Sequence, residues 1–215
     1  MRIHSVHLNA YQIGMMKDFY VNTLSMKLVR EREDSFLVQV GDSFLSFEKG
    51  DEKPFYHFAC LMTAAAYEDA ASRIPEKDVL HLGESWKWEA KQIYFPDPDG
   101  NIVELLGIDD SKQNPSSDWL KIVEIGLPVP NIEEFKKELK AIKDTHDGDS
   151  ETFQFYGDQE GVLVLTKEGR PWYPTDRGAT IHPTTVEVES EENFIIEALD
   201  VPYKIIGRTC EDLEG

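Results

Sequence analysis

The chain has 215 residues, of which 40% are hydrophobic and 11% aromatic, and its formal net charge is −19. This length is sufficient for one large domain or for two small domains with their own cores. The excess of 41 acidic over 22 basic side chains repels the phosphates of nucleic acids and of anionic membranes. We therefore expect neither a nucleic acid nor a membrane as a partner.

Three features bear on where the protein works. No apolar run approaches the roughly 18 residues of a membrane-spanning helix. Residues 1–11 lack the apolar segment of a signal peptide, so we expect none. Cys60 and Cys210 are far apart and outside any CxxC pattern, which favours a reducing, cytoplasmic environment and argues against a zinc ribbon.

The first 50 residues predict a strand, a helix and three further strands. Residues 1–10 alternate loosely as a strand does, and residues 12–24 carry apolar side chains at helical spacing. These apolar helix positions are Ile13, Met16, Phe19, Tyr20 and Leu24. Short strands are predicted over 27–32, 36–40 and 43–48, with turns at 33–34 and 41–42. The first unit is therefore β-α-β-β-β.

The same order of elements recurs along the chain, which indicates internal repeats. A second unit consists of a strand over 55–62, a helix over 64–74, a strand over 79–88 and a hairpin over 91–108. After the polar stretch 109–118, expected to be a linker, a third unit has a strand over 120–129, a helix from residue 130 and strands over 152–156 and 162–167. A fourth begins with a strand over 184–188 and a helix over 191–199, has a strand over 203–206 and lacks its last two strands. The second half of the chain is therefore expected to be shortened.

The stretch KQIYFPDPDGNIVELLGI, residues 91–108, combines a strand, a tight turn and a second strand. The proline, aspartate and glycine residues of PDPDGN are typical of turns. The second strand is apolar except for Glu104 at its centre. Because an unpaired buried carboxylate is costly, Glu104 either faces solvent or contacts a cation or a metal ion.

These features resemble the vicinal oxygen chelate superfamily, whose members include glyoxalase I, fosfomycin-resistance enzymes, extradiol dioxygenases and bleomycin-binding proteins. The resemblance rests on the repeated β-α-β-β-β units, the FY pair in the first helix and the sequence DPDGNIVELL, and it covers residues 1–108 more closely than 118–206. It implies an α+β fold in which paired βαβββ modules form curled mixed sheets with flanking helices. It also implies a glyoxalase-like domain over 1–110 and a second, incomplete one over 118–215.

In that superfamily a metal lies in the cup between two paired units, with His or Glu ligands on the first and last strands of the units. The resemblance places His57 and Glu104 at two ligand positions and Ser5, a poor ligand, at a third. His7 and Glu48 lie on the same strand faces as the missing ligands and would complete a shifted site. The resemblance therefore implies that His57, Glu104, His7 and Glu48 bind the metal, and that Glu104 and His57 are catalytic.

Glu124 occupies the first-strand position of the third unit. We expect it to be a strand-edge or dimer-contact residue. Pro183 stands where the fourth unit would need a histidine. The second cup is therefore expected to bind no metal.

The resemblance leaves two functions open. In the first, the protein is a lyase, isomerase or dioxygenase that depends on a divalent metal (Fe, Mn, Ni, Co or Zn) and acts on a small oxygen-rich molecule. In the second, it is a metal-free binding protein of the bleomycin-resistance type, whose aromatic cup sequesters a drug or toxin and whose His57 bonds Glu104 directly. Both imply a small-molecule ligand, and a homodimer is the assembly to test. No GxSxG, P-loop, GxGxxG or HExxH motif supports another class of enzyme.

Overall fold

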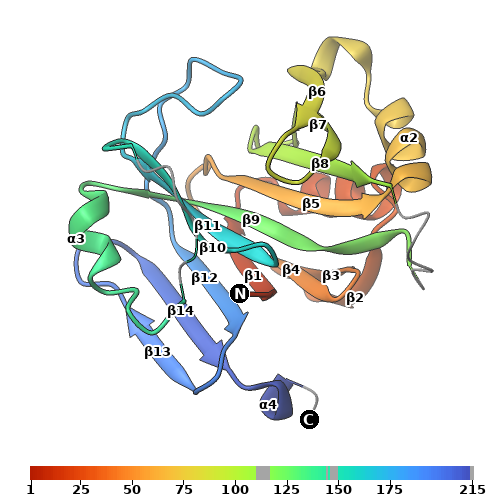
Figure 1. Ribbon diagram of the computed structural model, residues 1–215. Coiled ribbons are helices and arrows are strands. Elements are labelled where there is room, and N and C mark those ends of the chain that lie inside the picture. Colours follow the sequence, from red (N-terminus) through yellow and green to blue (C-terminus); the bar gives the residue numbers. More distant parts are fainter. Residues whose placement is uncertain (110–116, 144, 146–149, 214–215) are drawn as a thin grey trace.

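The computed structural model describes residues 1–109, 117–143, 145 and 150–213. Within these residues the strands form two seven-stranded mixed sheets that pack against each other, with short helices at their margins (Figure 1). The predicted α+β fold, with paired modules, curled mixed sheets and a shortened second half, is confirmed.

The first sheet joins the beginning and the end of the chain. Its strand order is β13-β14-β12-β1-β4-β3-β2. These strands are β1 (Ile3–Ala10), β2 (Lys27–Glu31), β3 (Ser35–Val40), β4 (Ser43–Lys49), β12 (Thr184–Glu189), β13 (Phe194–Glu197) and β14 (Tyr203–Arg208). Strand β1 pairs in parallel with β4 and antiparallel with β12, so the first and fourth units share this sheet.

The second sheet contains the middle of the chain. Its strand order is β10-β11-β9-β5-β8-β7-β6. These strands are β5 (His57–Thr63), β6 (His81–Ser85), β7 (Ala90–Pro96), β8 (Ile102–Ile108), β9 (Trp119–Val129), β10 (Phe153–Asp158) and β11 (Gly161–Lys167). Strand β5 pairs in parallel with β8 and antiparallel with β9, so the second and third units share this sheet.

Each sheet therefore takes strands from both of the expected domains, 1–110 and 118–215. The first and second units lie in different sheets, because each pairs with a unit from the second half of the chain. Residues 110–116, inside the stretch expected to be a linker, lie outside the described residues. This pairing decides which side chains can meet in one cup.

The helices agree with the sequence prediction in part. They are α1 (Ile13–Asp18), which continues as the wider turn η1 (Phe19–Thr23), then α2 (Ala64–Arg73), η2 (Glu76–Asp78), α3 (Ile132–Lys136) and α4 (Cys210–Leu213). The helices predicted over 12–24 and 64–74 are confirmed. The helix predicted over 191–199 is wrong, because Phe194–Glu197 form β13, which pairs antiparallel with β14. The ring of Phe194 lies directly over Gly207 of β14, a packing that a helix would not provide.

The main hydrophobic core lies between the two sheets. Tyr20 from η1 is fully buried there, with its ring centroid 6.4 Å from that of Phe58 on β5. Strands β5 and β8 are buried along nearly their whole length, as strands covered on both faces are. Phe58 and Val103 belong to this core. Because side chains alternate along a strand, their neighbours His57 and Glu104 face away from the first sheet.

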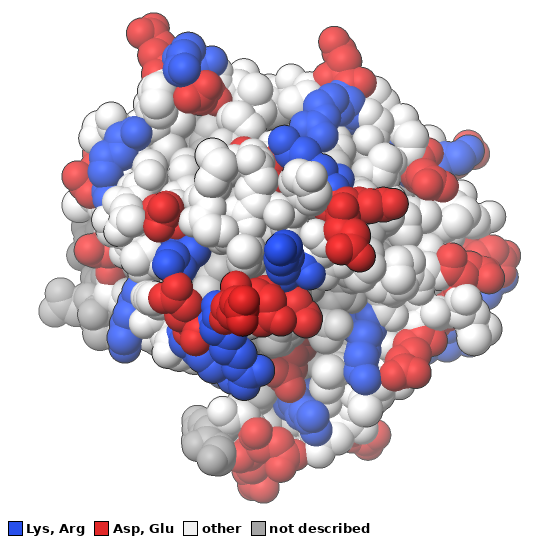
Figure 2. All heavy atoms as spheres, turned by 180° about the vertical axis from the view of Figure 1, so that it is seen from behind, with Lys and Arg blue, Asp and Glu red and all other residues white. Residues whose placement is uncertain are grey.

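The surface carries charges of both signs. On the face shown in Figure 2, acidic side chains are interspersed with lysines and arginines. None of the helices in the described part of the chain has the length and apolar character needed to cross a membrane.

Candidate metal centre

The turn PDPDGN holds the start of β8 in place. The Asp97 N–H donates to the Asn101 carbonyl at 3.0 Å, and the Gly100 N–H donates to the Asp97 carbonyl at 2.8 Å. Gly100 has a φ of +81°, a conformation that glycine adopts without strain. The buried carboxylate of Asp99 accepts a hydrogen bond of 2.7 Å from the N–H of Tyr11, just before α1. The turn is therefore held both by its own backbone and by the first unit.

Three polar side chains lie on neighbouring strands of the second sheet. Ala59 of β5 pairs with Glu104 of β8 on one side and with Glu124 of β9 on the other. Residues directly opposite one another on neighbouring strands point to the same face, so both carboxylates project on one side of the sheet. His57 precedes Ala59 by two positions and projects on this side too. The register of the sheet thus brings one histidine and two glutamates together.

His57, Glu104 and Glu124 are the one group of three or more such ligand-type side chains found in the described part of the chain. Their ligand atoms all lie within 4.8 Å of one another. His57 Nε2 is 3.8 Å from Glu104 Oε2 and 3.9 Å from Glu124 Oε2, which is too far for a hydrogen bond. All three residues are buried, with at most 5% of their surface exposed. Atoms about 2.0–2.2 Å from one metal ion lie roughly 3–4 Å apart, so this spacing suits a shared ion.

Each of the three side chains is oriented by a further contact. His57 Nδ1 donates to the Ile102 carbonyl at 3.3 Å, which leaves Nε2 facing the two glutamates. Tyr94 donates a hydrogen bond to Glu104, and Trp88 Nε1 donates one to Glu124 Oε1. Outer contacts of this kind fix the orientation of metal ligands in proteins. The cluster therefore has both inner donor atoms and the outer partners that hold them.

The electrostatics of the cluster favour a bound cation. Burial raises the pKa of Glu104 well above its usual value, the charge of Glu124 raises it further, and the hydrogen bond from Tyr94 opposes the shift. Two buried carboxylates that face each other are costly to ionise unless a positive charge lies between them. One imidazole nitrogen and carboxylate oxygens form a donor set that suits Fe, Mn, Ni, Co or Zn. The residues present therefore fit a divalent metal ion.

The cluster opens into a cavity of about 290 Å³. Six aromatic side chains line it, namely Trp86, Tyr94, Phe153, Phe155, Trp172 and Tyr173. Trp172 lies on the connection between β11 and β12, the blue loop above β11 in Figure 1, and its ring centroid is 5.0 Å from that of His57. Gly126 makes this position accessible, because a Cβ there would come within 2.7 Å of the Trp172 ring. A small molecule in this cavity would lie between aromatic walls and the cluster.

Comparison with known proteins finds solved structures of similar architecture. No family model and no curated protein matches the sequence. Among solved structures, a proposed dioxygenase from Bacillus subtilis is similar, with 13% identity and a TM-score of 0.63 over 96% of this chain and 85% of that chain. A variant of glyoxalase I from Zea mays is also similar, with 15% identity and a TM-score of 0.60 over 99% of this chain and 94% of that chain. The chain has the vicinal oxygen chelate fold. At these identities the likeness shows the fold alone.

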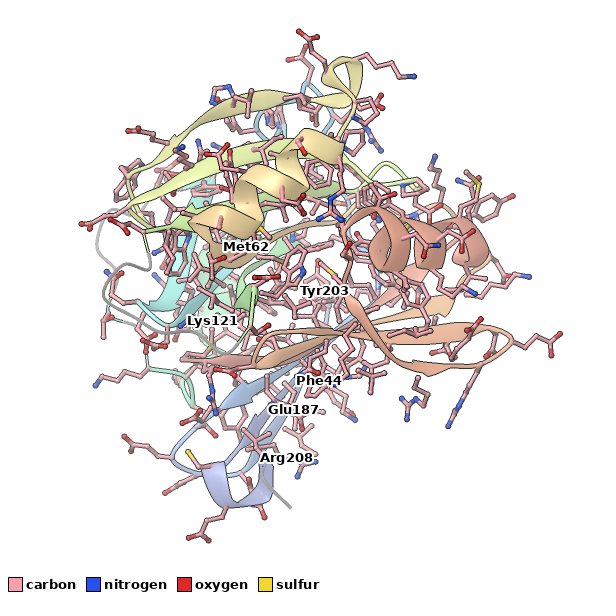
Figure 3. All side chains as sticks on the ribbon, turned by 90° about the vertical axis from the view of Figure 1, so that its right-hand side faces the viewer. Phe44, Met62, Lys121, Glu187, Tyr203 and Arg208 are labelled. Atoms are coloured by element: carbon pink, nitrogen blue, oxygen red, sulfur yellow. The ribbon has the colours of Figure 1, made fainter. Side chains whose placement is uncertain are left out.

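Within this vicinal oxygen chelate fold, His7 and Glu48 lie away from the cluster. His7 is on β1 and Glu48 is near the end of β4, both in the first sheet. Ser5 Oγ donates to Glu187 at 3.3 Å and lies 3.1 Å from His7 Nε2. Glu187 projects from the side of the first sheet that faces away from the second (Figure 3). The expected ligands His7 and Glu48 therefore lie in a different sheet from His57 and Glu104. Ser5 lies in the first sheet as well.

Glu124 is the residue of the cluster that the sequence analysis did not assign to a metal. It lies on β9 between β11 and β5 and is 5% exposed, so the expectation of a strand-edge residue is wrong. The available signal was its place in the first strand of the third unit, which corresponds to the place of His57 in the second. That signal becomes usable only once these two units are known to share a sheet.

Proposed function

We propose that this protein is an enzyme that depends on a divalent metal ion and acts on a small oxygen-rich molecule, as a glyoxalase-type lyase or a dioxygenase does. The proposed ligands are His57, Glu104 and Glu124. The observation that supports this most directly is the convergence of His57 Nε2 with an oxygen of each glutamate beside an aromatic cavity. His7 and Glu48 have no part in this site. We also propose that the protein works in the cytoplasm.

The side chains around the cavity would have different roles in the reaction. When bound, the metal supplies Lewis-acid polarisation of substrate oxygens. Burial raises the pKa of Glu104 well above its usual value. Oε2, the atom nearest His57 Nε2, would bind the metal, and Oε1 is the atom proposed to accept and return a substrate proton. Tyr94 stays protonated because burial and the charge of Glu104 raise its pKa, and its O–H keeps that carboxylate oriented. The aromatic walls exclude water from the same space.

Elemental analysis of protein purified without chelators and without an affinity tag tests the proposal. We expect a stoichiometric divalent metal in the wild type. His57→Ala and Glu124→Gln should each lose it. His7→Ala and Glu48→Gln are matched controls from the first sheet and should retain it. Metal-free wild-type protein whose melting temperature does not respond to Mn, Fe, Co, Ni or Zn ions would contradict the proposal.

The aromatic lining of the cavity favours a second candidate function. A cup with six aromatic side chains can hold a planar ligand without any metal, as a sequestering protein would. The two functions differ in what survives substitution of the cluster. A binding protein would retain its ligand affinity in the His57→Ala variant, whereas the enzyme would lose both metal and turnover.

A further inference from the structure

One wall of the cavity carries a row in which cations and aromatic rings are in contact. Lys87 Nζ lies 4.5 Å from the ring centroid of Phe155, and Arg170 Cζ lies 4.7 Å from that of Phe153. The two phenylalanine rings of β10 meet edge to face, with centroids 5.1 Å apart. Lys87 comes from the turn between β6 and β7, and Arg170 from the connection between β11 and β12. Two basic side chains from distant parts of the chain are thus held at one cavity.

The guanidinium of Arg170 has N–H donors without an acceptor among the described residues. Its Nη1 donates to the Pro171 carbonyl at 3.4 Å, and no carboxylate among the described residues forms an ion pair with it. By contrast, Arg73 pairs with Asp69 and Arg208 pairs with Glu187. In a chain with 41 acidic side chains, an arginine that lines a cavity without an acidic partner is well placed to bind an anion. Its planar fork of donors suits a carboxylate in particular.

Trp172 adds a second unused donor. The residue as a whole is only 2% exposed, and its buried Nε1 has no hydrogen-bond acceptor among the residues that the structure describes. An indole N–H can only donate, and leaving it unsatisfied in the interior is costly. The ring lines the cavity beside His57. A ligand oxygen in the cavity would satisfy this donor.

We infer that the cavity binds a small aromatic carboxylate. Its ring would lie among the aromatic walls, its carboxylate would face Arg170, and one of its oxygens would accept the hydrogen bond of Trp172. A volume of about 290 Å³ suits a ligand with a single ring. Glu84 is the one acidic lining residue outside the metal cluster, and Arg170 offsets its charge. Small aromatic carboxylates would then be the substrate class of the proposed enzyme, and their conversion rests on the proposed function. Their binding to the cavity does not.

Isothermal titration of two matched probes tests the inference. Salicylate carries a carboxylate, and salicylamide is its neutral counterpart at pH 7. Both are titrated into protein treated with a chelating resin and again after Mn²⁺ is added. We expect salicylate to bind at least about tenfold more tightly than salicylamide in both conditions, which is the size of effect that one good charged contact provides.

Two variants test the roles of Arg170 and Trp172 separately. Arg170→Gln should abolish the preference for salicylate, while Arg32→Gln, which removes the same charge from the exposed turn between β2 and β3, should keep it. Trp172→Phe keeps an aromatic ring without the N–H and should weaken both probes about tenfold while their ratio stays. If Arg170→Gln fails to fold, the wild-type ratio and the Trp172→Phe titration decide.

Equal affinity for the two probes, or no binding of either, would overturn the inference. A preference that persists in Arg170→Gln would do the same. Failure of the proposed metal site gives a different result, because salicylate would then still bind to metal-free protein while Mn²⁺ would not bind at all. Metal binding without any preference for salicylate would leave the proposed function in place and remove only the substrate class.

Discussion

His57 Nε2 on β5 lies 3.9 Å from Glu124 Oε2 on β9, so two repeats of the chain meet within one cluster. The contact exists because β5 and β9 are antiparallel neighbours, with Ala59 directly opposite Glu124. Glu104 reaches the same point from β8, on the other side of β5. The candidate site is therefore shared between the second and third units, and substitutions on β9 should affect it as strongly as those on β5 or β8.

Metal ions should stabilise the folded protein through this cluster. Binding to the folded state alone raises the free energy of unfolding by about 2.7 kcal/mol when the free metal is a hundredfold above its Kd. Differential scanning calorimetry with and without metal measures this effect. Glu124→Gln should remove the stabilisation, and Glu187→Gln, a glutamate of β12 in the first sheet, should leave it unchanged. An equal metal response in the two variants would show that the metal binds elsewhere.

The indole N–H of Trp88 should support metal affinity without touching the metal. It donates to Glu124 Oε1, and loss of such an outer partner typically lowers metal affinity by about 10–100-fold. We expect Trp88→Phe to weaken binding within this range in a metal titration. Trp86→Phe is the control, because Trp86 is 84% exposed and makes no such bond to a carboxylate of the cluster. Unchanged affinity in Trp88→Phe would mean that Glu124 needs no orienting partner.

Asp97 should make stability depend on pH. Burial raises its pKa from 3.8 to about 6, while hydrogen bonds from Asn101 and Tyr20 oppose the shift. A carboxyl group whose pKa is raised by folding stabilises the folded state below its unfolded value near 3.8, and this contribution is lost as the pH rises through about 6. The rise in the pKa of Asp97 from 3.8 to about 6 corresponds to about 3 kcal/mol.

Urea unfolding between pH 4 and pH 7 measures this dependence. The wild type should lose stability with rising pH relative to Asp97→Asn, which cannot ionise. Asp34→Asn removes an exposed carboxylate and should follow the wild-type profile. Parallel profiles for the wild type and Asp97→Asn would mean that Asp97 keeps an ordinary pKa in the folded protein.

Gly126 should be required for the position of Trp172. A Cβ at residue 126 would lie 2.7 Å from the Trp172 ring and 3.1 Å from the backbone oxygen of His57. Gly126→Ala should therefore destabilise the protein by about 1–3 kcal/mol in urea unfolding and weaken salicylate binding. Gly14→Ala is the matched control, because a Cβ there meets nothing within 4 Å. That control lies in α1 and should stabilise by about 0.4–1 kcal/mol. A neutral Gly126→Ala would mean that the Trp172 loop yields without cost.

Local sequence patterns determined much of this fold. Short apolar runs predicted β5 and β8, and the spacing of apolar residues predicted the helices over 12–24 and 64–74. The turn residues of PDPDGN predicted the hairpin that leads into β8. Such patterns work because side-chain periodicity and turn conformation depend on only a few neighbouring residues. The pairing of His57 with Glu104 came from the resemblance to the vicinal oxygen chelate superfamily, and both residues lie in one repeat.

Tertiary structure decided which repeats share a sheet, and therefore which residues join the cluster. Glu124 enters and His7 stays out because β5 has β9, rather than β1, as its second neighbour. Strand pairing between repeats is set by the burial of whole sheet faces over long separations in the chain, which no short window of sequence contains. The exchange of a predicted helix for β13 has the same origin, because pairing with β14 and packing of Phe194 on Gly207 outweigh local helical spacing.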